Sequence, residues 1–183
     1  TAVGNGALDS NTTASNNTAV GSAALTANTT GTRNTAVGAN SLDANTTGSY
    51  NVGVGNFTLT SNTTGQQNTA LGEDAMDANT TGSHNVGIGR VALAANTTGT
   101  QNVAVGALAL DASTIAHNNT AIGYAALSAD TLGGANVAIG TNALTTQNFT
   151  STTNSFNVGV GYGAGNQVTT GVQNTLIGGL AGD

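Results

Sequence analysis

The chain has 183 residues, of which 5% are charged and 3% are aromatic, and it contains neither Pro nor Cys. A net charge of −6, with two Arg and no Lys, excludes a basic surface that would displace counterions from phosphate, so we expect no nucleic-acid partner. Without Cys there is neither a disulfide framework nor a thiolate metal site, and no apolar run approaches the length of a membrane span.

A short repeat with a fixed step organises the chain, and the segment 34–50, NTAVGANSLDANTTGSY, is one copy of it. The Asn that leads each copy recurs at Asn17, Asn34, Asn51, Asn68, Asn85, Asn102, Asn119, Asn136, Asn157 and Asn174. Such a period is typical of a solenoid, in which one coil cannot bury its apolar face without its neighbours. The 27 Gly and the many Asn and Thr are also typical of low-complexity disorder, but disorder does not need a strict register. We therefore predict an all-β parallel solenoid, a single continuous repeat domain over residues 1–183 with regular coils over 1–146.

Positions 2 to 4 of each copy, counted from the leading Asn, have the composition of a short strand. The fourth is aliphatic and mostly β-branched, the second alternates between Thr and Val, and the third is nearly always Ala or Gly. Because residues two apart share a face, we expect positions 2 and 4 to point into the core with the aliphatic residue at position 9. The small third position is expected to approach another backbone. The predicted core residues are Val20, Leu25, Val37, Leu42, Val54, Leu59, Leu71, Met76, Ile88 and Leu93.

Position 5 is Gly in every copy, which predicts φ > 0 or a corner without room for a Cβ atom. The predicted turn residues are Gly21, Gly38, Gly55, Gly72, Gly89, Gly106, Gly123 and Gly140. Position 10 carries Asp in alternate coils, at Asp9, Asp43, Asp77 and Asp111. Stacked carboxylates would repel one another, so this alternation is expected of a stack of coils.

The segment NTTG closes most copies, and its Asn lies in an N-glycosylation acceptor pattern. The acceptor residues are Asn11, Asn28, Asn45, Asn62, Asn79 and Asn96. The alternative is an Asn ladder, in which stacked amides hydrogen-bond from coil to coil. A coil spacing of about 4.8 Å is too small for a row of bulky glycans, so we expect most of these Asn to be unmodified. The Thr pairs that follow would form Thr ladders, which suit an ice-binding surface, although Thr is also a good strand residue.

The repeat is interrupted once, between Asn136 and Asn157, where the step is longer than in the other copies. The extra residues lie at about 147–154 and bring Phe149 and Phe156 into a polar stretch, so we predict an inserted loop that is a candidate binding loop. Variant coils follow over residues 157–183.

Residue types that carry chemistry are sparse. His84 and His117 have no carboxylate or second His beside them, and Glu73 and Asp74 would face opposite ways in an extended segment. The Gly-rich stretch 159–165 is not followed by a helical pattern, so it is not a dinucleotide motif. We predict a protein that is not an enzyme and that has no cofactor and no metal.

The copies NTAVG, NVGVG, NTALG and NVAIG, each followed by a small residue, Leu and a second turn, resemble the head repeats of YadA-like trimeric autotransporter adhesins. They also resemble repeats in phage-tail-fibre-like bacterial surface proteins. The resemblance covers the whole chain and implies a homotrimer of left-handed parallel β-rolls, with Val and Leu in the core and the small positions at subunit contacts. The chain departs from the adhesin pattern in the length of its coil, because the usual adhesin coil is shorter.

These observations together predict a non-enzymatic, extracellular or cell-surface segment of a fibrous or adhesive protein, a rigid rod for attachment or spacing. The expected partner is the chain itself, in a trimer or filament, with a host surface or matrix as a further partner. A phage tail-fibre or receptor-binding shaft is one alternative, and an ice-binding protein is another.

Overall fold

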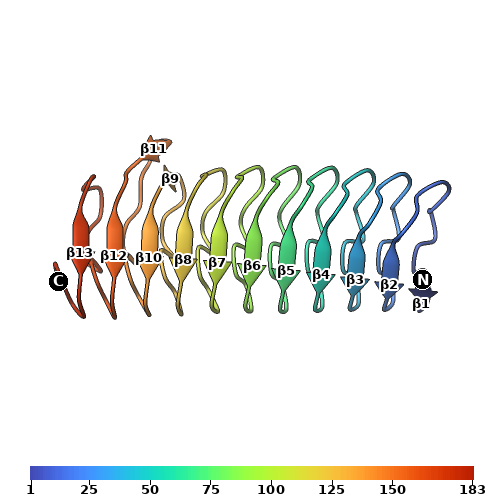
Figure 1. Cartoon of the computed structure of the whole chain (residues 1–183), viewed down its shortest axis with the longest axis horizontal. Coiled ribbons are helices and arrows are strands. Elements are labelled where there is room, and N and C mark those ends of the chain that lie inside the picture. Colours follow the sequence, from blue (N-terminus) through green and yellow to red (C-terminus); the bar gives the residue numbers. More distant parts are fainter.

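The computed structural model describes all residues from Thr1 to Asp183 and confirms the prediction of an all-β parallel solenoid, with coils of about 17 residues. Figure 1 shows the coils stacked side by side, with the two termini at opposite ends of the rod. Eleven strands, one from each coil, form a single parallel sheet, and a second sheet has two strands. The strands are β1 (Ala2–Val3), β2 (Thr18–Val20), β3 (Thr35–Val37), β4 (Val52–Val54), β5 (Thr69–Leu71), β6 (Val86–Ile88), β7 (Val103–Val105), β8 (Thr120–Ile122), β9 (Gly133–Gly134), β10 (Val137–Ile139), β11 (Thr153–Asn154), β12 (Val158–Val160) and β13 (Thr175–Ile177).

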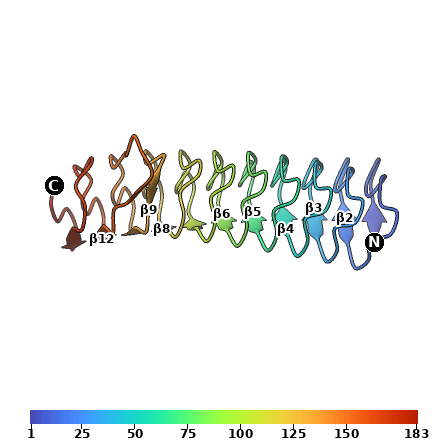
Figure 2. The same ribbon diagram turned by 90° about the horizontal axis from the view of Figure 1, so that it is seen from above.

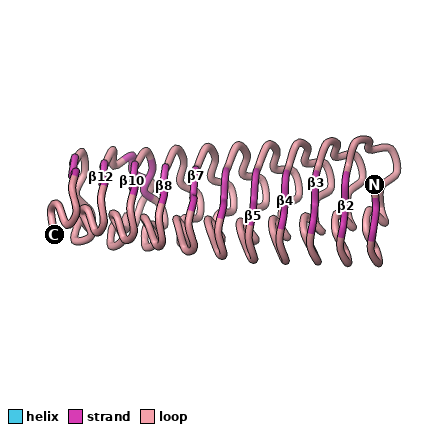
Figure 3. Tube along the Cα trace, turned by 60° about the horizontal axis from the view of Figure 1, so that its bottom comes forward, coloured by secondary structure: helices cyan, strands magenta, loops and turns pink.

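The register of the sheet follows the repeat. Thr18 pairs with Thr35, and each later residue of a strand pairs with its equivalent in the next coil. The stack continues across the interruption, since Val137 of β10 pairs with Val158 of β12. Of 113 backbone hydrogen bonds, only 20 join one strand to another. Coil-to-coil bonding continues around the loops that make up most of each coil, as from Leu25 N–H to the carbonyl of Ser41 (Figures 2 and 3).

No strand is longer than three residues, and in the main sheet the Gly at position 5 turns the chain at the end of each strand. The predicted turn glycines have φ between +123° and +142°, a region that side chains with a Cβ atom rarely adopt. A Cβ atom on Gly72 would also lie 2.7 Å from the backbone carbon and oxygen of Gly89 in the next coil. Both the backbone angle and the space therefore require Gly at this corner.

The core is a narrow column of small side chains with one large aliphatic residue per coil. Position 3 faces inward, with Ala36 and Ala70 fully buried, and position 9 supplies one fully buried large residue in each of the eight coils from Leu25 to Leu144. The Leu and Met half of the predicted core, at Leu25, Leu42, Leu59, Met76 and Leu93, thus lies inside.

The other half of the predicted core is wrong. Val20 and Val37 are 37% exposed, Leu71 is 45% exposed, and Val54 and Ile88 are half-buried. The alternation along a strand requires positions 2 and 4 to share a face, but it does not determine which face is inside. The width of the coil decides this, because the interior has room only for Ala or Gly at position 3.

Two regular coils that carry Gly instead of Ala at position 3 show how tightly the interior is packed. A Cβ atom on Gly53 would lie 2.6 Å from the hydroxyl of Ser41, and one on Gly87 would lie 2.7 Å from Cγ of Met76. Position 3 is therefore Gly where a hydroxyl or a Met occupies the space that Ala fills elsewhere.

Candidate functional site

The sheet presents an outward face, made of positions 2 and 4 of every coil, that we call the outer face. Position 2 contributes Thr18, Thr35, Val52, Thr69, Val86, Val103, Thr120, Val137, Val158 and Thr175. Position 4 contributes Val20, Val37, Val54, Leu71, Ile88, Val105, Ile122, Ile139, Val160 and Ile177. None of these side chains is charged, and the straight register places them in two parallel files along the rod. The outer face thus carries a continuous aliphatic file at position 4 beside a mixed file of Thr and Val at position 2.

Two Asn ladders run through the rod beside the core. In the ladder of leading residues, Asn34 Oδ1 accepts from the backbone N–H of Asn51 at 2.9 Å, and Asn34 Nδ2 donates to the carbonyl of Gly48 at 2.8 Å. In the NTT ladder, Asn45 Nδ2 donates to Asn28 Oδ1 at 2.9 Å and to the carbonyl of Gly48 at 3.0 Å. The Asn ladder is therefore the arrangement that the structure shows.

This arrangement contradicts glycosylation as the role of the NTT segment. Asn28, Asn45, Asn62, Asn79 and Asn96 are fully buried, so a glycan on Nδ2 would have no room and would remove ladder hydrogen bonds. At the first coil, Asn11 is half-buried and its Nδ2 donates to the carbonyl of Ala14 at 3.1 Å.

The two Thr of the NTT segment differ in their surroundings. The first is half-buried, and its hydroxyl donates to the backbone of the next coil, as from Thr29 to the carbonyl of Thr46 at 3.0 Å. The second is exposed, as at Thr30 and Thr47. Only one of the two Thr files thus has free hydroxyl groups.

The inserted loop leaves the rod at Gln147, which is buried in the place of an NTT Asn. Gln147 Nε2 donates to Asp130 Oδ2 at 2.6 Å, and Gln147 Oε1 accepts from Asn157 Nδ2 at 2.7 Å. The two Phe predicted to form a binding loop do not act together, because Phe149 is 6% exposed whereas Phe156 is 53% exposed. At this point the backbone N–H groups of Phe149 and Gly133 both donate to Asp130 Oδ1.

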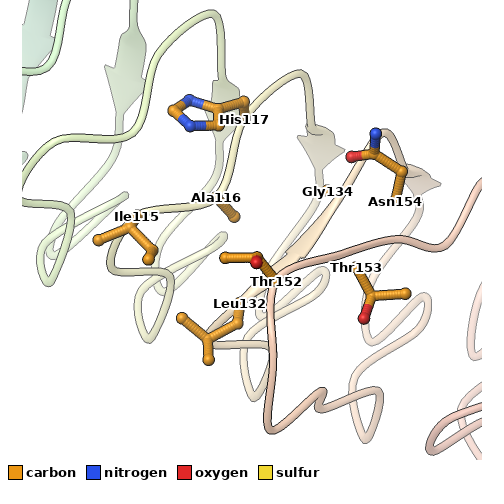
Figure 4. A pocket seen from close by; sticks show the side chains of 8 residues that line it. All are labelled: Ile115, Ala116, His117, Leu132, Gly134, Thr152, Thr153 and Asn154. Carbon is orange, nitrogen blue, oxygen red and sulfur yellow. The ribbon is translucent and has the colours of Figure 1, made fainter.

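Beyond Gln147 the loop forms β11, which pairs with β9 and borders a solvent-open pocket of about 230 Å³ that we call the insertion cavity (Figure 4). Its lining residues are Ile115, Ala116, His117, Leu132, Gly134, Thr152, Thr153 and Asn154. The sequence predicted a binding loop here, but it did not predict that residues of the two preceding coils line the cavity. The feature that could have indicated them is the replacement of NTTG by other residues in those two coils.

The acidic file at position 10 is the most unusual electrostatic feature. Burial raises the pKa of Asp43, Asp77 and Asp111 above the ordinary value of 3.8, partly offset by backbone hydrogen bonds, and Asp74 adds repulsion at Asp77. Oδ1 of Asp43 and Oδ1 of Asp111 are buried and have no hydrogen-bond partner. In a coil with Thr at this position, Thr60 Oγ1 donates to the carbonyl of Asn40 at 3.2 Å, and a neutral carboxyl can donate in the same way.

We therefore expect the protein to be more stable near pH 4 than near pH 7. A carboxyl group with a raised folded pKa contributes stability that is fully present below the unfolded pKa of 3.8 and is lost as the pH rises through the folded pKa. Melting curves across this range measure the effect. The triple variant Asp43→Thr, Asp77→Thr and Asp111→Thr, which adopts the residue that Thr26 and Thr60 supply at this position, should lose most of the dependence. A melting temperature that rises towards pH 7 in the parent and not in the variant would contradict this assignment.

The remaining residues singled out for chemistry stay apart. His84 is exposed, and His117 is exposed with Nδ1 accepting from the backbone N–H of Thr100 at 2.9 Å. Glu73 is exposed and Asp74 is half-buried. No group of three His, Cys, Asp or Glu side chains is placed to hold a metal ion, and no helix is long and apolar enough to cross a membrane.

Comparisons of the chain with protein-family models, with curated proteins and with solved structures found no match. What is established is thus the class of architecture, a β-solenoid of about 17-residue coils with Asn ladders.

Proposed function

We propose that the chain is a rigid, non-enzymatic segment of an extracellular fibrous surface protein, which associates with copies of itself through the outer face and serves attachment or spacing. The observation that carries this proposal is the uncharged outer face, whose aliphatic file is solvent-exposed in the single chain, as at Val37, Leu71 and Ile122. Burial of these side chains against equivalent ones would remove a strip of apolar surface from water along the whole rod.

A trimer is the assembly that we propose, for two reasons. The core is thin, with one large aliphatic side chain per coil, so a second source of apolar burial is needed. The resemblance of NTAVG and its variants to the head repeats of YadA-like adhesins implies three chains around one axis. The resemblance placed the small positions at the subunit contacts, whereas the present geometry offers the β-branched positions instead, because Ala36 and its equivalents face the coil interior.

The alternatives differ in how well the surfaces support them. A tail-fibre or receptor-binding shaft would use the same assembled rod, so it remains the second candidate. The ice-binding alternative relied on paired Thr ladders, and the hydroxyl groups of one ladder already donate to backbone carbonyls, as from Thr46 to Thr63 at 3.1 Å. Because these hydroxyl groups are already hydrogen-bonded, only the second Thr ladder has free hydroxyl groups to bind ice.

The variant Ile88→Glu tests the proposed interface. A carboxylate in the middle of an apolar contact would be desolvated without a partner, so we expect the particle mass in sedimentation to fall to one third of the parent value. Thr81→Glu is the matched control, because Thr81 is exposed on the NTT edge of a neighbouring coil and should leave the mass unchanged. An oligomer that survives Ile88→Glu and Ile122→Glu together would place the interface elsewhere.

A further inference from the structure

The insertion cavity is the one cavity in the structure, and it coincides with the one interruption of the repeat. Its roof is fixed by the parallel pairing of Thr153 with Gly133 and of Asn154 with Gly134. Its volume of about 230 Å³ is below the range typical of pockets for drug-sized ligands, so it suits a single small ring.

The floor of the cavity is apolar, whereas the equivalent positions of the regular coils are polar. The position that follows the first Thr of NTT is exposed Thr in the first six coils, at Thr13, Thr30, Thr47, Thr64, Thr81 and Thr98. The next three coils carry Ile115, Leu132 and Phe149 at this position. Ile115 and Leu132 line the cavity, and Ile115 is 37% exposed. The file thus changes from hydroxyl to hydrocarbon at the coils that border the cavity.

The rim of the cavity offers hydrogen-bonding groups without a net charge. Because His117 Nδ1 accepts from the backbone N–H of Thr100, the neutral ring carries its proton on Nε2, which has no partner in the protein. The side chains of Thr152 and Asn154 also make no hydrogen bond within the chain, and no Asp, Glu, Arg or Lys lines the cavity. A Cβ atom on Gly134 would lie 2.9 Å from Asn154 Oδ1, so Gly134 keeps the space beside this amide open. Figure 4 shows His117 and Asn154 at the upper edge of the cavity, with Thr152, Leu132 and Ile115 below them.

We propose that the insertion cavity binds one neutral sugar ring. The apolar face of the ring would pack on Ile115 and Leu132, and its hydroxyl groups would hydrogen-bond to His117 Nε2, the Thr152 hydroxyl and the Asn154 amide. A ring with a carboxylate would meet no cation here, so charged sugars are disfavoured. The cavity lies on the loop edge and not on positions 2 and 4, so this site is independent of the oligomer proposed above.

An NMR titration of the full chain tests the site, with glucose, galactose, mannose and N-acetylglucosamine as neutral probes and N-acetylneuraminic acid as the charged comparison. At least one neutral sugar should produce saturable shifts at the backbone amides of Leu132, Thr152 and Asn154, and the charged sugar should bind more weakly. A methyl glycoside and a disaccharide with the same non-reducing end distinguish a free monosaccharide from the terminal residue of a glycan, because only a site for glycan ends accepts both.

Two variants adopt residues of the regular coils and so preserve the fold. Leu132→Thr restores the usual residue of its file, and His117→Ser keeps an oxygen acceptor for the N–H of Thr100, as Ser49 Oγ does for Thr32 at 3.0 Å. Each should weaken binding about tenfold or more, since each removes a floor or rim contact. His84→Ser, an exposed His outside the cavity, is the control and should bind as the parent does. The proposal is overturned if no probe gives saturable shifts, or if Leu132→Thr binds as tightly as the parent. Sedimentation of the same samples shows whether the oligomer fails separately.

Discussion

Replacement of Gly72 by Val should destabilise the rod by about 2–4 kcal/mol. Gly72 has φ +123°, which a β-branched residue tolerates badly, and its Cβ atom would lie 2.7 Å from the backbone of Gly89. The contact is with backbone of the next coil, which cannot move without disturbing the stack. Chemical denaturation at a fixed protein concentration measures the loss.

Gly6→Asn is the control for this substitution. Gly6 also has positive φ, at +69°, but the nearest atom to its Cβ atom is 4.0 Å away, at Ala23 Cα. Asn40 and Asn142 adopt similar angles at the equivalent position, so Asn fits there. We expect a change within about 0.5 kcal/mol. A Val variant of Gly72 as stable as the parent would mean that the corner has ordinary backbone angles.

Replacement of Asn62 by Ala should cost about 3–6 kcal/mol, because three hydrogen bonds in a fully buried ladder are lost together. Asn62 Nδ2 donates to Asn45 Oδ1 at 2.8 Å and to the carbonyl of Gly65 at 3.1 Å, and Asn62 Oδ1 accepts from Asn79 Nδ2 at 2.8 Å. The oxygen of Asn45 is left buried without a donor, which is the largest part of the penalty.

The urea midpoint of the Asn62→Ala variant measures this cost. Thr64→Ala is its matched control, because Thr64 is exposed two residues further along the same coil and should change the midpoint little. Equal midpoints for the two variants would mean that the NTT ladder does not stabilise the stack.

Much of the architecture could be predicted from the period alone. A strict step from one leading Asn to the next places equivalent residues side by side, which is sufficient to predict the parallel register, the Gly corner and the Asn ladders. The buried Leu file, at Leu25, Leu42 and their equivalents, follows from the same periodicity and from hydrophobicity.

The orientation of the strand could not be predicted in the same way. Thr35 and Val37 share a face whether that face is inside or outside, and only the three-dimensional width of the coil excludes them from the interior. The fully buried Ala36 shows that the smallest side chain in the strand is the one that fits. By hydrophobicity alone, Val37 would have been expected inside and Ala36 outside.

The backbone angles of the turns could not be predicted from residue propensities either. Left-handed angles were expected only of Gly, yet each regular coil places three other residues there, as Ala23, Leu25 and Arg33 show with φ of 55°, 52° and 59°. Val91 adopts φ 61°, which is rare for a β-branched residue. Stacking of identical coils imposes these angles, because each coil must follow the path of its neighbours.

The sequence predicted where the candidate binding loop lies, but not which residues surround it. The longer step between Asn136 and Asn157 indicated the loop, but the backbone N–H of Phe149 donates to Asp130, which lies in the preceding coil. No local pattern connects residues that far apart.

Sedimentation equilibrium of the unaltered chain tests the central claim, that the outer face joins copies of this rod, most directly. We expect a particle of three times the 17.6 kDa of the single chain, which dissociates when Ile88 is replaced by Glu. A stable, fully folded particle of 17.6 kDa with its outer face in water would contradict the claim.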